Sequence, residues 1–217
     1  MAAFDLEEQE QISQIKGWWE QYGKLVTTLA VAAALASVGW QGWNWYKGKQ
    51  AAEASALYDQ LQTAAAEHNA PKVREVAGAL LEKFSGTAYA DLAALLSAKV
   101  QAEAGDLKNA RAPLAWAAEK ASDPALRDLA RLRLASVMLD DKAYDEALAQ
   151  LQTAPDESLA ARFADLKGDI LVAQGKKEEA RAAYKTVVSS LESATKAESV
   201  TLREIAQAKL DAVGGAQ

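Results

Sequence analysis

The residues best suited to chemistry in this 217-residue chain are its one histidine and three of its pairs of adjacent carboxylates. The histidine, His68, stands between an acidic residue and an amide residue. Histidine can act as a general acid or base near neutral pH, and paired carboxylates can share a proton or hold a metal ion. The carboxylate pairs are Asp140-Asp141, Asp156-Glu157 and Glu178-Glu179.

The positions of these residues favour a structural role over catalysis. Each acidic pair falls at an expected turn or in the first turn of an expected helix, where carboxylates cap free backbone N–H groups. His68 falls at an expected helix end, where a cation complements the helix dipole. The chain has no cysteine, glycine-rich phosphate loop, calcium-binding loop or zinc-ligand spacing. We therefore expect no enzyme activity, no cofactor, no metal and no small-molecule substrate.

Aromatic residues gather at the two edges of an uncharged segment. Residues 25–46 (LVTTLAVAAALASVGWQGWNWY) carry no charge, and a helix of this length extends about 33 Å, enough to cross the hydrocarbon core of a bilayer. Tryptophan and tyrosine prefer the membrane–water interface, because one end of each ring is apolar and the other polar. We predict a transmembrane helix over residues 25–46, between an N-terminal segment, residues 1–24, and a domain, residues 47–217. The expected aromatic belt is Trp18, Trp19, Tyr22, Trp40, Trp43, Trp45 and Tyr46.

Two other interpretations of the uncharged segment stay open. The sequence Ala34-Leu35-Ala36 fits a signal-peptidase site, although the 24 residues before the segment form a long, acidic leader where a short, basic one is expected. An alanine-rich helix could also be buried in a soluble protein. We favour a retained span. The lysines flanking it are balanced, two on each side, so charge does not decide its orientation.

The distribution of charge argues against nucleic-acid binding. The formal net charge is −6, and it divides evenly between the N-terminal segment and the domain. Neither part carries the cationic surface that binding to phosphates requires. The domain itself is long enough to bury a sizeable core.

Residues 51–217 are rich in alanine and leucine and show helical rather than alternating periodicity. Short segments rich in Gly, Pro, Asp and Ser divide this region into candidate helices, and their alternating spacing indicates that the helices come in pairs. We expect a closing helix at residues 195–213. The predicted breaks are residues 68–71, 85–87, 105–106, 122–124, 140–142, 154–156 and 175–176.

Three of the expected helix pairs share an internal pattern. A small residue on the first helix precedes an alanine on the second helix by twelve positions, and a larger residue follows four positions later. Small residues at matched places allow antiparallel helices to approach closely. The pattern resembles the tetratricopeptide repeat, so the predicted fold is all-α, a helical-repeat solenoid. The three sets are Ala98, Ala110 and Leu114; Ala135, Ala147 and Leu151; and Gly168, Ala180 and Tyr184.

Residues that flank the small residue of each first helix are expected to face a concave groove that binds protein partners. The apolar members of this set suit a role in the core equally well. The candidate groove residues are Leu95 and Lys99, Leu132 and Ser136, and Asp165 and Asp169.

Three further motifs connect the chain to a known family. They are E-x-x-x-x-I-K-x-W-W at residues 10–19, G-W-x-x-W at residues 39–43 and A-D-L-x-G-D at residues 164–169. With them, nearly the whole chain resembles the bacterial ancillary SecYEG translocon subunits, the YfgM-like family. The resemblance implies a single-pass protein of the bacterial inner membrane, with its N-terminus in the cytoplasm and its repeat domain in the periplasm. The implied partners are the Sec translocon, a membrane-anchored periplasmic chaperone, exported client proteins and the lipid bilayer.

The expected function is therefore that of a non-enzymatic adaptor, which links exported proteins at the translocon to periplasmic chaperones. Two other functions fit the same fold. One is a scaffold for cell-envelope assembly or division, and the other is a signalling adaptor that faces the cytoplasm and is unrelated to translocation. Fold alone does not decide among them.

Overall fold

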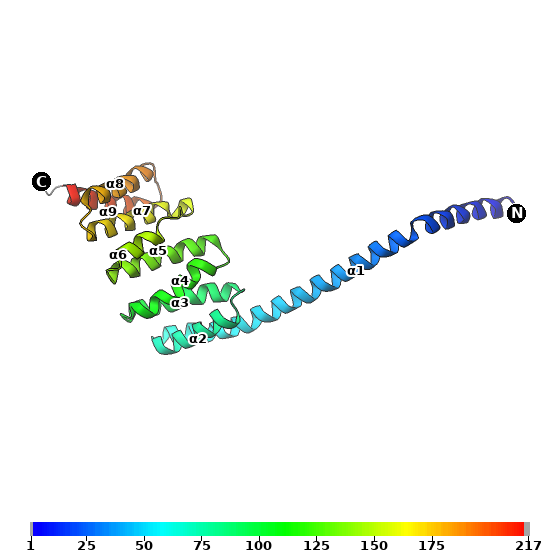
Figure 1. Ribbon diagram of the computed structural model, residues 1–217, viewed down its shortest axis with the longest axis horizontal. Coiled ribbons are helices and arrows are strands. Elements are labelled where there is room, and N and C mark those ends of the chain that lie inside the picture. Colours follow the sequence, from blue (N-terminus) through cyan, green and yellow to red (C-terminus); the bar gives the residue numbers. More distant parts are fainter. Residues whose placement is uncertain (1, 215–217) are drawn as a thin grey trace. The chain divides into compact units, whose positions relative to one another are not determined.

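The computed structural model describes residues 2–214, which form nine helices and no strand (Figure 1). The chain divides into two units, Met1–Gln50 and Ala51–Gln217. Helix α1 (Ala2–Ala66) supplies all of the described part of the first unit, and its last sixteen residues belong to the second. The predicted all-α class is confirmed.

In the first unit the side chains of residues 11–50 are mostly exposed. The part of α1 from Gln11 to Ala66 contains a stretch long and apolar enough to cross a membrane, and none of that stretch is buried. The hydroxyls of Thr27, Thr28 and Ser37 donate hydrogen bonds to carbonyls four residues earlier, at 2.7, 2.7 and 2.9 Å. These three hydroxyls are thus satisfied within the helix, as a lipid environment demands.

The second unit is a stack of antiparallel helix pairs (Figure 1). Residues 51–66 of α1 pair with α2, α3 pairs with α4, α5 with α6 and α7 with α8, and α9 follows; we call the first member of each pair the leading helix. Every predicted break overlaps a connection between two helices, and three of them extend one or two residues into a helix end, so the predicted pairing is confirmed. The bounds are α2 (Ala70–Lys83), α3 (Ala88–Glu103), α4 (Leu107–Lys120), α5 (Pro124–Asp140), α6 (Tyr144–Gln150), α7 (Glu157–Ala173), α8 (Lys177–Ser190) and α9 (Ala197–Gly214).

Each leading helix ends in the same tight turn. His68, Gly105, Lys142 and Gly175 have φ angles of 53°, 77°, 60° and 77°, and we call them the left-handed residues. In each turn the N–H of the next residue donates to the carbonyl five positions earlier, at 2.8 to 2.9 Å, which satisfies a carbonyl that the helix end leaves free. Steps of 37, 37 and 33 residues separate these four positions, so they define the register of the repeat.

The left-handed residues offer a direct test of this register. We expect Lys142→Gly to raise the free energy of unfolding by about 1 kcal/mol, because glycine adopts a positive φ without strain. Gly175→Ala should lower it by about 1 kcal/mol. A Cβ at Gly175 meets no atom within 4 Å, so only the backbone is strained. Denaturant unfolding of the purified protein measures both changes.

A matched control is Lys167→Gly in the interior of α7, where the same substitution should cost about 1 kcal/mol. If Lys142→Gly and Lys167→Gly change stability in the same direction, residue 142 is not left-handed in solution.

The predicted close approaches of the paired helices lie in the core. The small residues of the three sets are all buried, and those on the second helices are completely inaccessible to solvent. Three apolar clusters run along the stack: one joins α1 to α3, one is centred on α3 to α5, and one joins α7 to α9. The buried small residues are Ala98, Ala135, Gly168, Ala110, Ala147 and Ala180.

Two buried carboxylates connect consecutive helix pairs. Asp91 of α3 is 1% exposed and accepts a hydrogen bond from the backbone N–H of Ser122, at 3.0 Å. Asp128 of α5 is 6% exposed and accepts one from the backbone N–H of Asp156, at 2.8 Å. Each carboxylate lies fourteen residues before the left-handed residue of its own pair, so the two contacts are equivalent. Each one ties a leading helix to the loop from which the next pair begins.

Candidate partner-binding surface and membrane segment

The six candidate groove residues occupy equivalent positions on three leading helices. They lie ten and six residues before the left-handed residues of their pairs. Helix α3 contacts α5, and α5 contacts α7, so equivalent positions follow one another along the stack. The residues are Leu95 and Lys99 on α3, Leu132 and Ser136 on α5, and Asp165 and Asp169 on α7.

Four of these residues differ in how available they are to a partner. Lys99 and Ser136 are exposed, and Leu132 is half-buried. The ammonium of Lys99 lies 3.7 Å from the carboxylate of Glu103 on the same helix, a weak surface contact that a partner could replace. Leu95 is 7% exposed and packs in the central core cluster, the alternative role that its apolar side chain allows.

The other two, Asp165 and Asp169, are brought together with a lysine from α9. The ammonium of Lys209 lies 2.9 Å from both oxygens of Asp165 and 2.8 Å from Asp169. The hydroxyl of Tyr184 on α8 donates to Asp169 at 2.7 Å, and Lys209 lies 5.6 Å from the centre of the Tyr184 ring. These four side chains form what we call the α9 latch, because they hold α9 against the last helix pair.

Burial and charge act in opposite directions within the α9 latch. Burial raises the pKa of Asp165, and the hydrogen bonds and attraction of Lys209 only partly offset this. Burial alone would lower the pKa of Lys209, but Asp169 and Asp165 together raise it. Burial, followed by the hydrogen bond to Asp169, raises the pKa of Tyr184. The raised pKa values of Lys209 and Tyr184 keep Lys209 cationic and Tyr184 neutral at pH 7.

Lys209 was not identified from the sequence. It is 40 and 44 residues from its two partners, too far for any helical spacing to relate them. The available signal was the pair of aspartates four residues apart on one face of α7, since two half-buried carboxylates require a nearby cation.

The acidic pairs take two different structural roles. Asp156 accepts a hydrogen bond from the backbone N–H of Ser158 at the start of α7, and the Ser158 side chain and backbone together lower the pKa of Asp156. The other acidic residues near a helix start lie in first turns as predicted: Glu157 of α7, and Glu178 and Glu179 of α8.

The capping prediction is wrong for the pair at residues 140–141. Asp141 lies at the carboxyl end of α5, and its carboxylate is 2.9 Å from the guanidinium of Arg111 on α4. It therefore joins two helix pairs instead of capping a helix start. His68 is the left-handed residue after α1. Among the described side chains, those of residues 11–214, no group of three or more His, Asp or Glu is placed to hold a metal ion.

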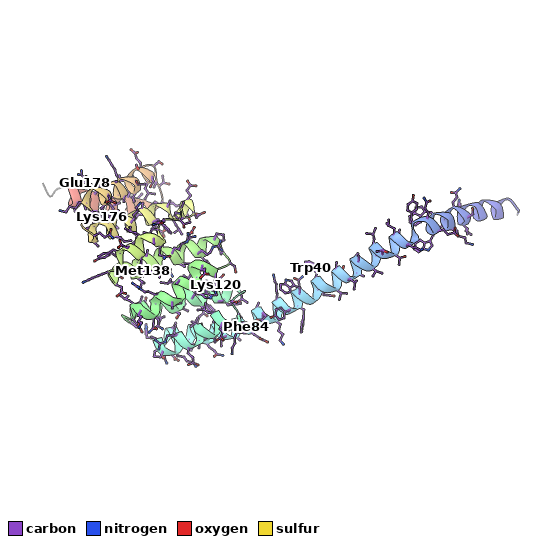
Figure 2. All side chains as sticks on the ribbon, in the orientation of Figure 1. Trp40, Phe84, Lys120, Met138, Lys176 and Glu178 are labelled. Carbon is purple, nitrogen blue, oxygen red and sulfur yellow. The ribbon has the colours of Figure 1, made fainter. Side chains whose placement is uncertain are left out.

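The seven belt residues all lie on α1 and are exposed. The rings of Trp18 and Tyr22 are 5.8 Å apart, and Trp40 projects outward from the helix (Figure 2). At the second edge, the ammonium of Lys47 lies 5.4 Å from the ring centre of Trp43. A ring and a cation at the same level of a helix suit the headgroup region of a bilayer. The aromatic belt stays a prediction at both edges, with Trp18, Trp19 and Tyr22 at the first and Trp40, Trp43, Trp45 and Tyr46 at the second.

An apolar helix able to cross a membrane, followed by a stack of helix pairs in regular register, defines a membrane-anchored helical-repeat protein. A family model described as a tetratricopeptide repeat-like domain matches residues 16–215. The chain belongs to this family, whose curated relatives are named ancillary SecYEG translocon subunits. The predicted family is confirmed.

Three of these relatives match over most of their length. The protein of Haemophilus influenzae is 33% identical over 188 residues, 87% of this chain and 92% of the relative. The Escherichia coli protein is 31% identical over 186 residues, which cover 84% of this chain and 88% of the relative. The Neisseria gonorrhoeae protein is 30% identical over 213 residues, which cover 97% of this chain and 99% of the relative. No solved structure matches the chain significantly.

Proposed function

We propose that this chain is a non-enzymatic adaptor of the bacterial inner membrane, which associates with the Sec translocon and binds protein partners through its repeat domain. The observation that carries the proposal is the extent of the similarity. The relatives named ancillary SecYEG translocon subunits match over 84 to 97% of this chain, so the match extends well beyond any single helix pair. In this proposal residues 25–46 span the membrane, residues 1–24 lie in the cytoplasm and residues 47–217 lie in the periplasm.

The mechanism combines tethering with recognition. A domain confined to the membrane meets the translocon at a high effective concentration, without any additional contact. The repeat domain then links exported proteins to a membrane-anchored periplasmic chaperone. Lys99, Leu132 and Ser136 are the candidate contacts for these partners, because the α9 latch already engages Asp165 and Asp169.

Co-purification tests the contribution of the apolar helix. The full-length protein, tagged and gently solubilised from membranes, should retain the translocon. The domain of residues 47–217, directed to the periplasm by a cleavable signal, should lose it, because a modest affinity no longer has the benefit of tethering. If the untethered domain retains the translocon as well as the full-length protein does, the apolar helix serves only for localisation.

A second variant in the same experiment tests the groove. Lys99→Glu with Ser136→Glu should keep the translocon and lose periplasmic partners, because interfacial charges determine specificity and register. The matched control is Lys177→Glu with Ser189→Glu, two exposed positions on α8. If the groove variant keeps every periplasmic partner, binding occurs on another face.

Single cysteines establish the orientation, since the chain contains none of its own. An impermeant thiol reagent added to intact spheroplasts should label a cysteine at Ser189 and not one at Ser13. The reverse result would support the cytoplasmic signalling adaptor. A periplasmic domain that co-purifies with division or envelope-assembly proteins and without the translocon would support the scaffold.

A further inference from the structure

An arginine recurs at one position of the repeat, six residues after the left-handed residue. Arg74 on α2 and Arg111 on α4 each reach a carboxylate in the turn that ends the next leading helix. Arg74 lies 3.7 Å from Asp106, and Arg111 lies 2.9 Å from Asp141. The first two pairs therefore each place a cation on the second helix, facing an acidic turn of the following pair.

The third pair departs from this arrangement. Its equivalent position is Leu148, which packs in the apolar cluster between α7 and α9. A hydrogen bond from the side-chain amide of Gln174 to Asp145, at 2.8 Å, joins this pair to the end of α7. The third pair therefore has no cation at this position, and it is joined to the next pair by the Gln174–Asp145 hydrogen bond instead of an ion pair.

The fourth pair has the arginine again, Arg181 on α8, but no helix pair follows it within residues 2–214. Helix α9 lies against α8 as the next leading helix would. A Cβ built at Gly214, at the end of α9, would be 3.6 Å from Nη2 of Arg181, so this guanidinium also points to the end of the next helix. Its ion partner is Glu178 of its own helix, at 3.4 Å and 83% exposed.

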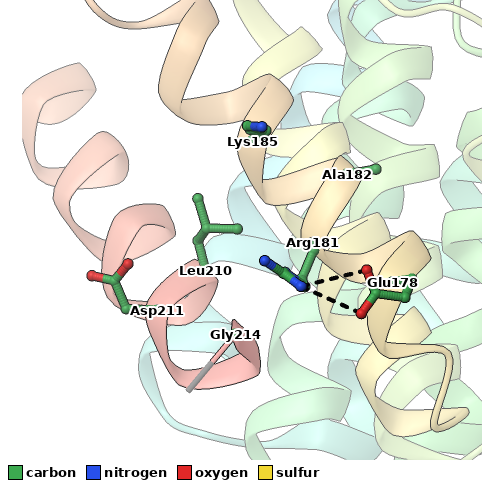
Figure 3. A pocket seen from close by; sticks show the side chains of 7 residues that line it. All are labelled: Glu178, Arg181, Ala182, Lys185, Leu210, Asp211 and Gly214. Atoms are coloured by element: carbon green, nitrogen blue, oxygen red, sulfur yellow. Dashed lines mark hydrogen bonds and ion pairs between the residues drawn. The ribbon is translucent and has the colours of Figure 1, made fainter. Parts of the chain in front are cut away.

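The surface at this point is hollowed, with a volume of about 640 Å³ (Figure 3). Two cations line the hollow, Arg181 and Lys185, and no ion pair of Lys185 occurs among the described residues. Leu210 provides an apolar wall. Asp211 accepts a hydrogen bond from Gln207 of its own helix at 2.8 Å, and its carboxylate is directed away from Arg181 (Figure 3).

We propose that this hollow, which we call the terminal hollow, binds a carboxylate side chain on a turn of a partner protein. A turn of the partner lies beside the end of α9, as acidic turns follow α3 and α5, and Arg181 receives its Asp or Glu as Arg74 and Arg111 receive theirs. Arginine is suited to this role, because its planar guanidinium accepts a carboxylate in a two-point contact. The terminal hollow is separate from the groove positions, so binding there does not depend on the proposed function of the groove.

The chain itself supplies a probe. A peptide of residues 138–150 contains four carboxylates, among them those of Asp141 and Glu146, which contact Arg111. The full-length protein is placed in phosphatidylcholine nanodiscs and titrated with this peptide. A neutral Gly-Ser segment extends its C-terminus, so that the terminal carboxylate does not lie near the hollow. The arginine Nε–H signals are followed by NMR. The signal of Arg181 should shift saturably, and added salt should weaken binding.

Matched variants identify the contact. Arg181→Gln should weaken binding of the peptide about tenfold, as expected for a charge-assisted pair, and Arg181→Lys should weaken it less. Lys177→Gln, on the same helix and outside the hollow, should have no effect. A peptide with its four carboxylates replaced by amides should bind the unaltered protein weakly. Its affinity should equal that of the acidic peptide for the Arg181→Gln variant. Equal binding by Arg181→Gln and the unaltered protein, equal binding of the two peptides, or no saturable shift at millimolar peptide overturns the proposal.

Discussion

Gly168→Ala is expected to lower the free energy of unfolding by about 2 to 3 kcal/mol, the upper range for an overpacked core. A Cβ at this position would overlap the ring of Tyr184 on α8. The ring cannot easily move away, because it is 2% exposed and its hydroxyl donates to Asp169. Denaturant unfolding of the purified protein, monitored by helical circular dichroism, measures the loss.

The control for this substitution is Gly78→Ala in α2. Gly78 is exposed, and a Cβ there meets no atom within 4 Å. Alanine should therefore stabilise the helix by about 1 kcal/mol. The double variant Gly168→Ala with Tyr184→Ala should lose less stability than the sum of the two single losses, because Tyr184→Ala removes the ring with which the new Cβ clashes. Equal effects of Gly168→Ala and Gly78→Ala would contradict the close approach of α7 and α8.

Lys209→Met is expected to lower the free energy of unfolding by about 2 kcal/mol at pH 7. Breaking a buried ion pair costs about 3 to 5 kcal/mol, and the α9 latch is only partly shielded from solvent. Without the ammonium, burial and the like charge of Asp169 act unopposed on Asp165 and raise its pKa in the folded state further above the unfolded value. The folded state then binds more protons than the unfolded state, so the loss should shrink as the pH falls from 7 to 5.

Unfolding of Lys209→Met and of the unaltered protein at pH 7 and pH 5 checks both the size and the sign. Lys167→Met, at an exposed position of α7, serves as the control and should change stability by less than about 0.5 kcal/mol. Adding Asp165→Asn and Asp169→Asn to Lys209→Met should recover part of the loss, because neutral partners no longer repel. A loss that is independent of pH, with no recovery in the triple variant, would show that the ion pairs do not hold α9.

The helix pairs could be predicted from the sequence because their boundaries are local. Pro71 and Pro124 lie at or beside helix starts, and Gly105 and Gly175 adopt the positive φ that ends a leading helix. His68 does the same in the first pair, but Leu61 and Val73 replace the small residues of the other pairs, so the register of that pair could not be predicted. The small residues at close approaches were also visible, since their spacing repeats along the chain.

The contacts between helix pairs could not be predicted in the same way. Asp91 is completely shielded from water, although aspartate is ordinarily an exposed residue. Its burial depends on a backbone donor 31 residues away. The cation of the α9 latch, Lys209, is likewise remote from its partners. Such pairs have no period in the sequence, because they arise only when separate helices are stacked.

The buried carboxylates Asp91 and Asp128 also bear on how a repeat can diverge. Each binds the downstream loop through a backbone N–H, a group that every residue except proline provides. The two loops accordingly differ, Ser122-Asp123-Pro124 in one and Ala154-Pro155-Asp156 in the other, yet both make the same contact. In the second loop the donor is Asp156, directly after the one residue that could not donate. Because the contact uses the backbone of the loop, the loop side chains can be substituted without losing it. A duplicated helix pair would therefore carry its own means of attachment to the sequence that follows it.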